Sequence, residues 1–457
     1  MDRRQFLTRF GTAAAAAMTA PAALAENGTA GIELADLRGS VSALDYQVRP
    51  GAVDDQSARF QRMLDDAAQR GVPVFLPAGL YVISNIKLPE GASLHGVPGR
   101  TQLVYGGNGH LIAGNDLARV TLAGLTLDGA NRVTRNGAEG LIDLRGVVDA
   151  RIDDVIVRGA GQDGIYLERC GGRIERCTIT GAARFGVYAV ESAGLSIIGN
   201  RVKSCANGGI IVHRWTEGHD GTIIARNRIE GTGAGHGGTG QWGNAINVFR
   251  TDDVLIAGNR IEGSAFSAIR ANSARNIQIT GNNCRASGET AIYSEFSFEN
   301  AVVSANVIDG AASGISVTNF DHGGRAATVS GNIVRNIVAT GPYAAEPPGF
   351  GIGIAVEADT AVTGNMIEGV ALYGINAGWG RHLRDCVIGQ NVVRNAHIGI
   401  AFSTVEGAGQ VLVSNNLIDA RNGAIRGHRW AEIATGELLG ARRGMPANAV
   451  LANNRTV

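Results

Sequence analysis

Three residues of types that neutralise carboxylates or move protons recur at equivalent positions of the chain: Arg270, Tyr293 and His213. Each lies in a short stretch that alternates apolar and polar residues, which puts every second side chain on one face of a strand. Abstraction of a proton beside a carboxylate needs a group that neutralises the carboxylate and groups that transfer protons. We therefore predict that Arg270 and Asn247 neutralise the substrate carboxylate, and that Tyr293 or His213 transfers the proton beside it.

The neighbouring outward positions are predicted to bind substrate, in particular Asn272 and Glu295. Two long insertions flank this column of polar residues, with 19 residues from Asn227 to Ile246 and 22 from Asn332 to Ile354, where about ten is usual. Long loops on a rigid scaffold tend to carry function. A polar outward face is also typical of any solvated sheet, and exposed residues on it would contribute little to stability.

The tryptophans also lie in segments that flank these strands, and three of them are predicted to bind substrate: Trp215, Trp242 and Trp379. Aromatic faces beside a groove can stack on sugar rings. Aromatic rings that pack over the rims of the coils would explain the same positions. The sequence leaves both interpretations open.

The elements that position these residues follow from a repeat marked by asparagine. Ten asparagines each follow an aliphatic residue by three positions, at intervals that indicate a unit of about 23 residues with insertions. They are Asn200, Asn227, Asn259, Asn282, Asn306, Asn332, Asn365, Asn391, Asn416 and Asn454. Similar frames centred on Leu125, Val155 and Cys177 raise the prediction to about 13 coils of three short strands each, about 60 Å in length at the usual strand spacing.

This pattern resembles the right-handed parallel β-helix of the pectin-lyase-like superfamily over residues 50–457. A short capping helix is expected after Asp54-Asp55, with Phe60, Met63, Leu64 and Ala67 on its apolar face, and the chain would enter the first coil at 74–81. The resemblance implies that the asparagines stack as a ladder inside one bend. It also implies that a polysaccharide would lie across the outward face of one parallel sheet.

The residues favour lyase or epimerase chemistry on a uronate polymer over hydrolysis, if the protein is an enzyme. Glycoside hydrolysis needs clustered carboxylates, and the sequence predicts that no aspartate projects from the column. The chain has only two lysines, Lys87 and Lys203, and neither falls in the central column, so a lysine-based lyase is not expected. The alternative is a non-catalytic envelope or surface protein whose β-helix is a rigid spacer or partner platform.

The N-terminus has three consecutive features of an export signal. Arg3 and Arg4 precede an alanine-rich apolar run, and a small-residue cleavage site ends at Ala25. This start resembles a twin-arginine signal, and with the repeats it resembles the family of twin-arginine-translocated repetitive proteins. We expect a signal peptide at 1–25, a linker at 26–49 and the β-helix at 50–457. The resemblance implies the twin-arginine export machinery as a partner and a bacterial periplasmic or secreted location.

Composition limits the remaining partners. The net charge is +0, so the sequence predicts neither nucleic-acid binding nor attraction to an anionic membrane surface, and no further apolar run is long enough to span a membrane. The five cysteines show no CxxC spacing and are expected to be buried. No metal and no cofactor is predicted.

Overall fold

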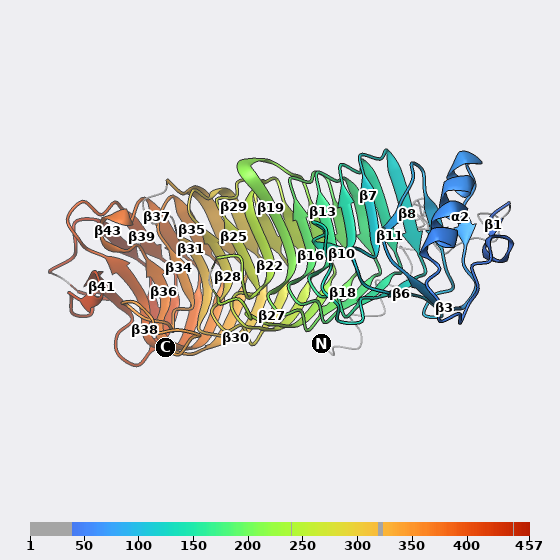
Figure 1. The fold of residues 1–457 in the computed structure, drawn as a ribbon. Helices are drawn as coiled ribbons and strands as arrows, with labels where there is room; N and C mark the ends of the chain where they lie inside the picture. Colours follow the sequence, from blue (N-terminus) through green and yellow to red (C-terminus); the bar gives the residue numbers. More distant parts are fainter. Residues whose placement is uncertain (1–38, 239, 319–322, 442) are drawn as a thin grey trace, which may run out of the picture. The chain divides into compact units, whose positions relative to one another are not determined.

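The computed structural model describes residues 39–457 except 239, 319–322 and 442. Short parallel strands stack coil upon coil in chain order (Figure 1). Helix α2 (Ser57–Gln69) lies at the N-terminal end of the stack, and it buries the four residues predicted for its apolar face. The helix begins where Asp55 Oδ1 accepts a hydrogen bond from the Ser57 N–H at 2.9 Å. Two 3₁₀ turns, η1 (Ala43–Tyr46) and η2 (Gly380–His382), complete the helical elements of the described residues.

The strands form three parallel ladders. The first ladder contains β1 (Val41–Ser42), β2 (Val74–Phe75), β5 (Ser93–His95), β8 (Arg119–Ala123), β11 (Asp149–Asp153), β14 (Gly172–Glu175), β17 (Ser196–Ile198), β20 (Ile223–Ala225), β23 (Leu255–Ala257), β26 (Gln278–Thr280), β29 (Glu299–Ser304), β32 (Arg325–Ser330), β35 (Thr360–Thr363), β37 (Cys386–Gly389), β39 (Val411–Ser414) and β43 (Ala449–Ala452). The second contains β3 (Gly79–Ile83), β6 (Thr101–Tyr105), β9 (Thr126–Asp128), β12 (Ile156–Arg158), β15 (Thr178–Thr180), β18 (Arg201–Lys203), β21 (Arg228–Thr232), β24 (Arg260–Ser264), β27 (Asn283–Arg285), β30 (Val307–Ala311), β33 (Ile333–Ile337), β36 (Met366–Ala377), β38 (Val392–Ser403), β40 (Leu417–Ala420) and β44 (Arg455–Thr456).

The third ladder carries the Gly-Ile-x-Val strands. It contains β4 (Ile86–Lys87), β7 (Ile112–Asn115), β10 (Gly140–Arg145), β13 (Asp163–Glu168), β16 (Phe185–Val190), β19 (Gly208–His219), β22 (Asn244–Asp252), β25 (Ile269–Asn272), β28 (Thr290–Glu295), β31 (Ser313–Thr318), β34 (Ile354–Val356), the later halves of β36 and β38, and β41 (Ile425–Arg429). The short strand β42 (Glu432–Ile433) pairs antiparallel with β41. The predicted fold class, an all-β right-handed parallel β-helix with a capping helix, is confirmed.

The number of coils is slightly larger than the sequence indicates. The first ladder has 16 strands, and β1 precedes the first coil, so β2 to β43 mark 15 coils instead of about 13. The two additional coils begin at β2 and β5. Their first bends run through Leu76-Pro77-Ala78 and 96–100, which lack the aliphatic-and-asparagine frame that identifies the later coils.

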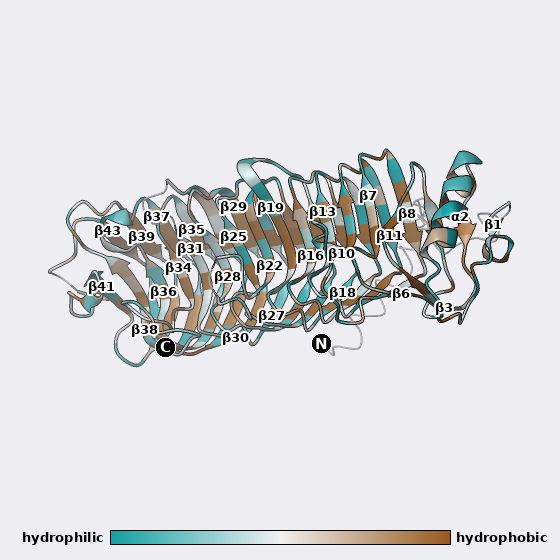
Figure 2. Ribbon diagram, in the orientation of Figure 1, coloured by the Kyte–Doolittle hydropathy of each residue, from teal (hydrophilic) through white to brown (hydrophobic). Residues whose placement is uncertain are grey.

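The interior of the coils holds aliphatic side chains and the asparagine ladder. Hydrophobic stretches recur from coil to coil along the stacked strands (Figure 2), and isoleucine and valine at nearly zero exposure dominate the core. Asn306 illustrates the ladder. Its N–H donates to Asn332 Oδ1 at 2.9 Å, and its Nδ2 donates to Ile279 O at 2.9 Å and to Asn332 Oδ1 at 3.0 Å. The same contacts run through all ten predicted asparagines, so each coil is hydrogen-bonded to the next at this bend.

Candidate functional site

The structure brings together four of the predicted site residues on β25 and β28. Arg270 Nε donates to Glu295 Oε1 at 2.6 Å, and Asn272 Nδ2 donates to the same oxygen at 2.9 Å. The Arg270 guanidinium lies over the ring of Tyr293, with 5.2 Å between its central carbon and the ring centroid. The predicted register is therefore observed, because Arg270 pairs with Tyr293 and Asn272 with Glu295 in adjacent coils.

This cluster is not an open column, as the sequence suggested, because a segment of the chain covers it. We call residues 338–352, which lead into β34, the Tyr343 segment. The Tyr343 hydroxyl donates to Glu289 Oε1 at 2.6 Å, and its ring stacks on Phe266 and contacts Phe350. Arg270 is 8% exposed, and Glu289 lies 3.9 Å from its guanidinium.

The covered arginine is already neutralised by protein carboxylates. One guanidinium faces Glu289 and Glu295, which are both buried, so it has no net positive charge left for a substrate carboxylate. Sequence reasoning missed both Glu289 and Tyr343. The length of the insertion signalled a loop but not the direction in which it folds. The catalytic role of Arg270, Tyr293 and His213 remains a prediction, and the burial of this ion pair argues against it.

The other long insertion, between Asn227 and Ile246, ends in a short segment that borders an open cavity. We call residues 240–243, which lead into β22, the Trp242 segment. Trp242 stacks on Phe185 two coils earlier, with 5.3 Å between ring centroids and 10° between planes. The Gly240 carbonyl, which accepts hydrogen bonds from Asn244 and Asn247, and the Gly243 N–H, which donates to the Asn207 carbonyl at 2.6 Å, anchor the segment.

We call the cavity below this segment the Trp242 pocket, and it has a volume of about 320 Å³. Its lining combines four aromatic rings with charged and polar groups from five consecutive coils. The lining residues are Glu139, Arg145, Tyr166, Arg184, Phe185, Tyr188, His213, Gln241 and Trp242. A cavity of this size, with apolar walls and a few polar groups, is the usual form of a small-molecule site.

Two ion-pair networks form the polar wall of the Trp242 pocket. Arg184 binds Asp163 through Nε and Nη2 at 3.1 and 2.6 Å, and it binds Glu139 through Nη1 at 2.8 Å. Arg145 binds Asp143 in the same bidentate way, at 2.8 and 3.1 Å. Burial raises the pKa of Asp163 to about 6, although Arg184 acts in the opposite direction.

These networks correct the expectation that no aspartate projects from this sheet. Asp143 pairs with the outward Tyr166 in the third ladder, and Asp163 is the first residue of β13, where its carboxylate binds Arg184. Carboxylates are therefore clustered on this face, at the N-terminal end of the column. The sequence signal was present in Gly140–Arg145, which has the same alternation as the later strands. The predicted column of outward residues nevertheless starts at Tyr166 and so leaves out Asp143.

His213 and Asn247 act in this arrangement as a hydrogen-bonded pair. His213 Nε2 lies 3.1 Å from Asn247 Oδ1, and Asn247 Nδ2 donates to the Gly240 carbonyl at 3.1 Å. Burial lowers the pKa of His213 to about 4, so the ring is neutral at pH 7. Asn247 thus links the histidine to the Trp242 segment and positions both.

The other predicted residues lie apart from the Trp242 pocket. Trp215 is 57% exposed at the far end of β19, where its N–H donates to Glu191. Trp379 contacts the ring of Trp430 at the C-terminal coils, with 5.7 Å between centroids. Arg3, Arg4 and Ala25 lie outside the described residues.

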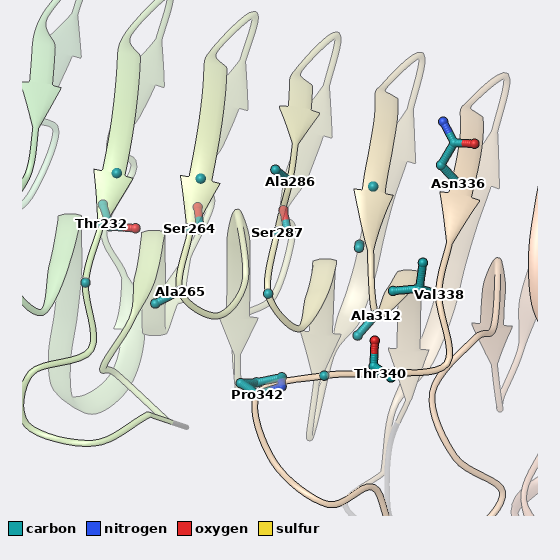
Figure 3. A pocket seen from close by; sticks show the side chains of 17 residues that line it. Thr232, Ser264, Ala265, Ala286, Ser287, Ala312, Asn336, Val338, Thr340 and Pro342 are labelled. Carbon is teal, nitrogen blue, oxygen red and sulfur yellow. The ribbon is translucent and has the colours of Figure 1, made fainter.

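A larger cavity, about 790 Å³, runs along the corner between the second and third ladders. Figure 3 shows it beneath the start of the Tyr343 segment, where Thr340 and Pro342 cross the ends of several coils. Glycine, serine, alanine and threonine make up most of its wall, including Thr232, Ser264, Ser287 and Ala312. Its lining carries no charged or aromatic side chain, so we place the candidate site in the Trp242 pocket.

The described residues add two findings about metals and membranes. Among residues 39–457, apart from the gaps given above, His, Cys, Asp and Glu do not gather in threes as metal ligands would. Within the same ranges, α2 and the other helical turns are too short or too polar to cross a lipid bilayer.

Comparisons with known proteins agree with this architecture. The sequence profile of the family described as "Right handed beta helix region" matches residues 140–237 and 215–393, which is more than half of the chain, so the protein belongs to that family. No curated protein sequence matches the chain.

Solved structures extend the likeness to most of the chain. The catalytic unit of a GH87 α-1,3-glucanase from Streptomyces thermodiastaticus strain HF3-3 matches with a TM-score of 0.57 and 14% identity, over 86% of this chain and 69% of that one. The N-terminal fragment of bacteriophage Phi29 gene product 12 matches with a TM-score of 0.55 and 14% identity, over 85% and 68%. The A-module of mannuronan C-5 epimerase AlgE6 from Azotobacter vinelandii matches with a TM-score of 0.50 and 13% identity, over 92% and 99%. At these identities the likeness shows the fold.

Proposed function

We propose that this protein is an exported polysaccharide-binding protein that holds its glycan in the Trp242 pocket. The observation that carries the proposal is the stacked Trp242–Phe185 pair beside the Arg184–Glu139–Asp163 network in one cavity. An aromatic plane packs against the apolar face of a sugar ring, and the polar network supplies partners for its hydroxyl groups. Two of the matched solved structures are named as an α-1,3-glucanase and a mannuronan epimerase, which is compatible with a glycan as ligand.

Binding of the full chain to an array of bacterial and plant polysaccharides tests the proposal. Trp242→Ala should lower affinity for the bound glycan at least tenfold, because it removes the stacking wall. Trp430→Ala is the matched control, since Trp430 is 47% exposed at the C-terminal coils and should not affect affinity. Unchanged binding by Trp242→Ala would place the glycan elsewhere, and absence of any glycan ligand would favour a spacer or partner platform.

The proposal gives binding priority over lyase or epimerase turnover. Proton abstraction beside a uronate carboxylate needs a cation that is free to neutralise that carboxylate. Arg270 is neutralised and covered, as described above. We therefore expect no lyase or epimerase turnover at Arg270 and Tyr293, and assay of the bound glycan for new unsaturated or epimerised residues checks that outcome.

Export is the second part of the proposal. Arg3, Arg4 and the small-residue site at Ala25 support twin-arginine transport to the periplasm or beyond, and with the repeats they support membership of the twin-arginine-translocated repetitive proteins. Replacement of both arginines by lysine should trap the precursor in the cytoplasm. Normal export of that variant would refute this part of the proposal without touching the binding site.

A further inference from the structure

The charges around the Trp242 pocket bear on which kind of sugar it takes. Each guanidinium in its wall is paired before any ligand arrives. Arg184 has three of its five N–H groups on Asp163 and Glu139, and Arg145 has Nε and Nη2 on Asp143 and a further bond from Nη2 to the Gly137 carbonyl at 2.6 Å.

The wider network has more carboxylates than cations. Glu168 lies 3.9 Å from Arg145 and also pairs with the exposed Arg169, so the arginines Arg145, Arg169 and Arg184 face the carboxylates of Glu139, Asp143, Asp163 and Glu168. The neighbouring His213 is neutral at pH 7 because burial lowers its pKa to about 4. The network therefore has no positive charge to spare at neutral pH.

A carboxylate that entered this pocket would lose water without gaining a counter-ion. The side chains of Asp143 and Asp163 are 4% and 0% exposed, so solvent screens their charges only weakly. These charges would repel the carboxylate of the ligand. A neutral sugar does not incur this penalty.

The same network still has hydrogen-bonding capacity. The N–H groups of Arg184 and Arg145 that protein atoms do not use are donors, and the Glu139 carboxylate, which is 38% exposed, is an acceptor. Guanidinium donors whose charge is already compensated, together with a carboxylate acceptor, match the hydroxyl groups of a sugar. The stacked Trp242–Phe185 pair supplies the apolar contact that a sugar ring also needs.

We propose that the Trp242 pocket selects a neutral, hydroxyl-rich sugar segment and discriminates against a uronate or otherwise anionic one. This inference rests on the proposed glycan-binding function and narrows its ligand class. It also departs from the uronate polymer that the residue types alone favour.

The test compares matched oligosaccharides of equal length, one set neutral hexoses and the other the corresponding uronates, against the full chain at low ionic strength and pH 7. We expect neutral oligomers to bind at least about tenfold more tightly than their uronates. Equal or tighter binding of the uronates would overturn the selectivity and leave the proposed binding function intact. Failure of both sets, with no other glycan bound on the polysaccharide array, would remove the binding function itself.

A variant that changes only the charge of the pocket tests whether electrostatic repulsion, and not the shape of the pocket, causes the preference for neutral oligosaccharides. Glu139→Gln keeps the size of the side chain and removes one negative charge from the wall, so it should narrow the preference for neutral oligomers several-fold. Glu230→Gln is the control, because Glu230 lies on β21 in the second ladder and pairs with Arg201. An unchanged preference in Glu139→Gln would show that electrostatic repulsion does not set the selectivity.

Discussion

The Trp242 and Tyr343 segments are similar insertions with different outcomes. Both lead into a strand of the third ladder, both fold back toward earlier coils, and both place an aromatic ring on a phenylalanine, Phe185 or Phe266. The Tyr343 segment closes over a buried ion pair, whereas the Trp242 segment keeps a cavity beside a partly exposed one. An aromatic insertion can therefore seal the residues beneath it, as the Tyr343 segment does, or form one side of a cavity, as the Trp242 segment does. We call the first a plug and the second a wall, and the charges beneath the insertion distinguish the two.

The largest expected effect tests the plug. Arg270→Ala would leave Glu289 and Glu295 buried without a counter-ion, so the free energy of unfolding should fall by about 3–5 kcal/mol, measured by chemical denaturation. Arg285→Ala, on the adjacent coil with a 57% exposed side chain, should change it by less than about 0.5 kcal/mol. Equal stability of the two variants would mean that Arg270 is solvated and that the Tyr343 segment does not seal the site.

An acid titration tests whether His213, beside the Trp242 segment, is shielded from water. His213 has a folded pKa of about 4 against an ordinary value of 6.5, so its stabilising contribution is complete above pH 6.5 and is lost as the pH falls toward 4. The loss amounts to about 3 kcal/mol. His213→Gln should therefore gain about that much stability relative to wild type between pH 7.5 and pH 4. Parallel stability curves would indicate that the ring titrates in contact with water.

The ladder that supports both segments should respond less strongly at any single position. Asn332→Ala leaves the Asn306 N–H without its acceptor and Asn306 Nδ2 with one of its two, and the expected cost is about 1–3 kcal/mol of unfolding free energy. The exposed Asn422 is the control, and Asn422→Ala should have little effect. If both variants unfold at the wild-type midpoint, the ladder amides are replaced by water at no cost.

The smallest effect on stability is expected at the wall. Trp242→Ala removes a stacked contact from a partly buried ring and should cost about 1 kcal/mol. Phe350→Ala, in the Tyr343 segment, removes a 9% exposed ring and should cost about 3 kcal/mol or more. Similar losses for the two rings, measured by thermal and chemical unfolding, would abolish the distinction between plug and wall.

The fold could be predicted because its determinants are local and repeated. An asparagine that follows an aliphatic residue by three positions reports one bend, and ten such residues report a stack. Coils that turn at Pro77 or at 96–100 lack this signal, so the count of about 13 omits them, although entry into the first coil at 74–81 was predicted. The register of Arg270 opposite Tyr293 was also predictable, because strand alternation and a constant repeat determine which side chains become neighbours.

The state of the site could not be predicted in the same way. Whether Arg270 faces solvent depends on Tyr343, which is 73 residues further along the chain and reaches back by a path that no repeat encodes. Likewise, Trp242 was recognised as a flanking aromatic residue, but its partner Phe185 was not. Loop direction is set by packing between distant residues, for which the sequence carries no periodic signal.

The asparagine ladder also gives the solenoid a polarity. Every ladder amide oxygen accepts from the coil before it, and every ladder N–H before Asn454 donates to the coil after it. Each ladder Nδ2 before Asn454 donates both to that later oxygen and to a backbone carbonyl of the coil before it. A coil is thus completed only when the next one has docked, and removal of a later coil strands two donors of its predecessor. Fraying should therefore proceed from the C-terminal side of the ladder inward, so that the chain unzips in the reverse of the order in which a ribosome releases it.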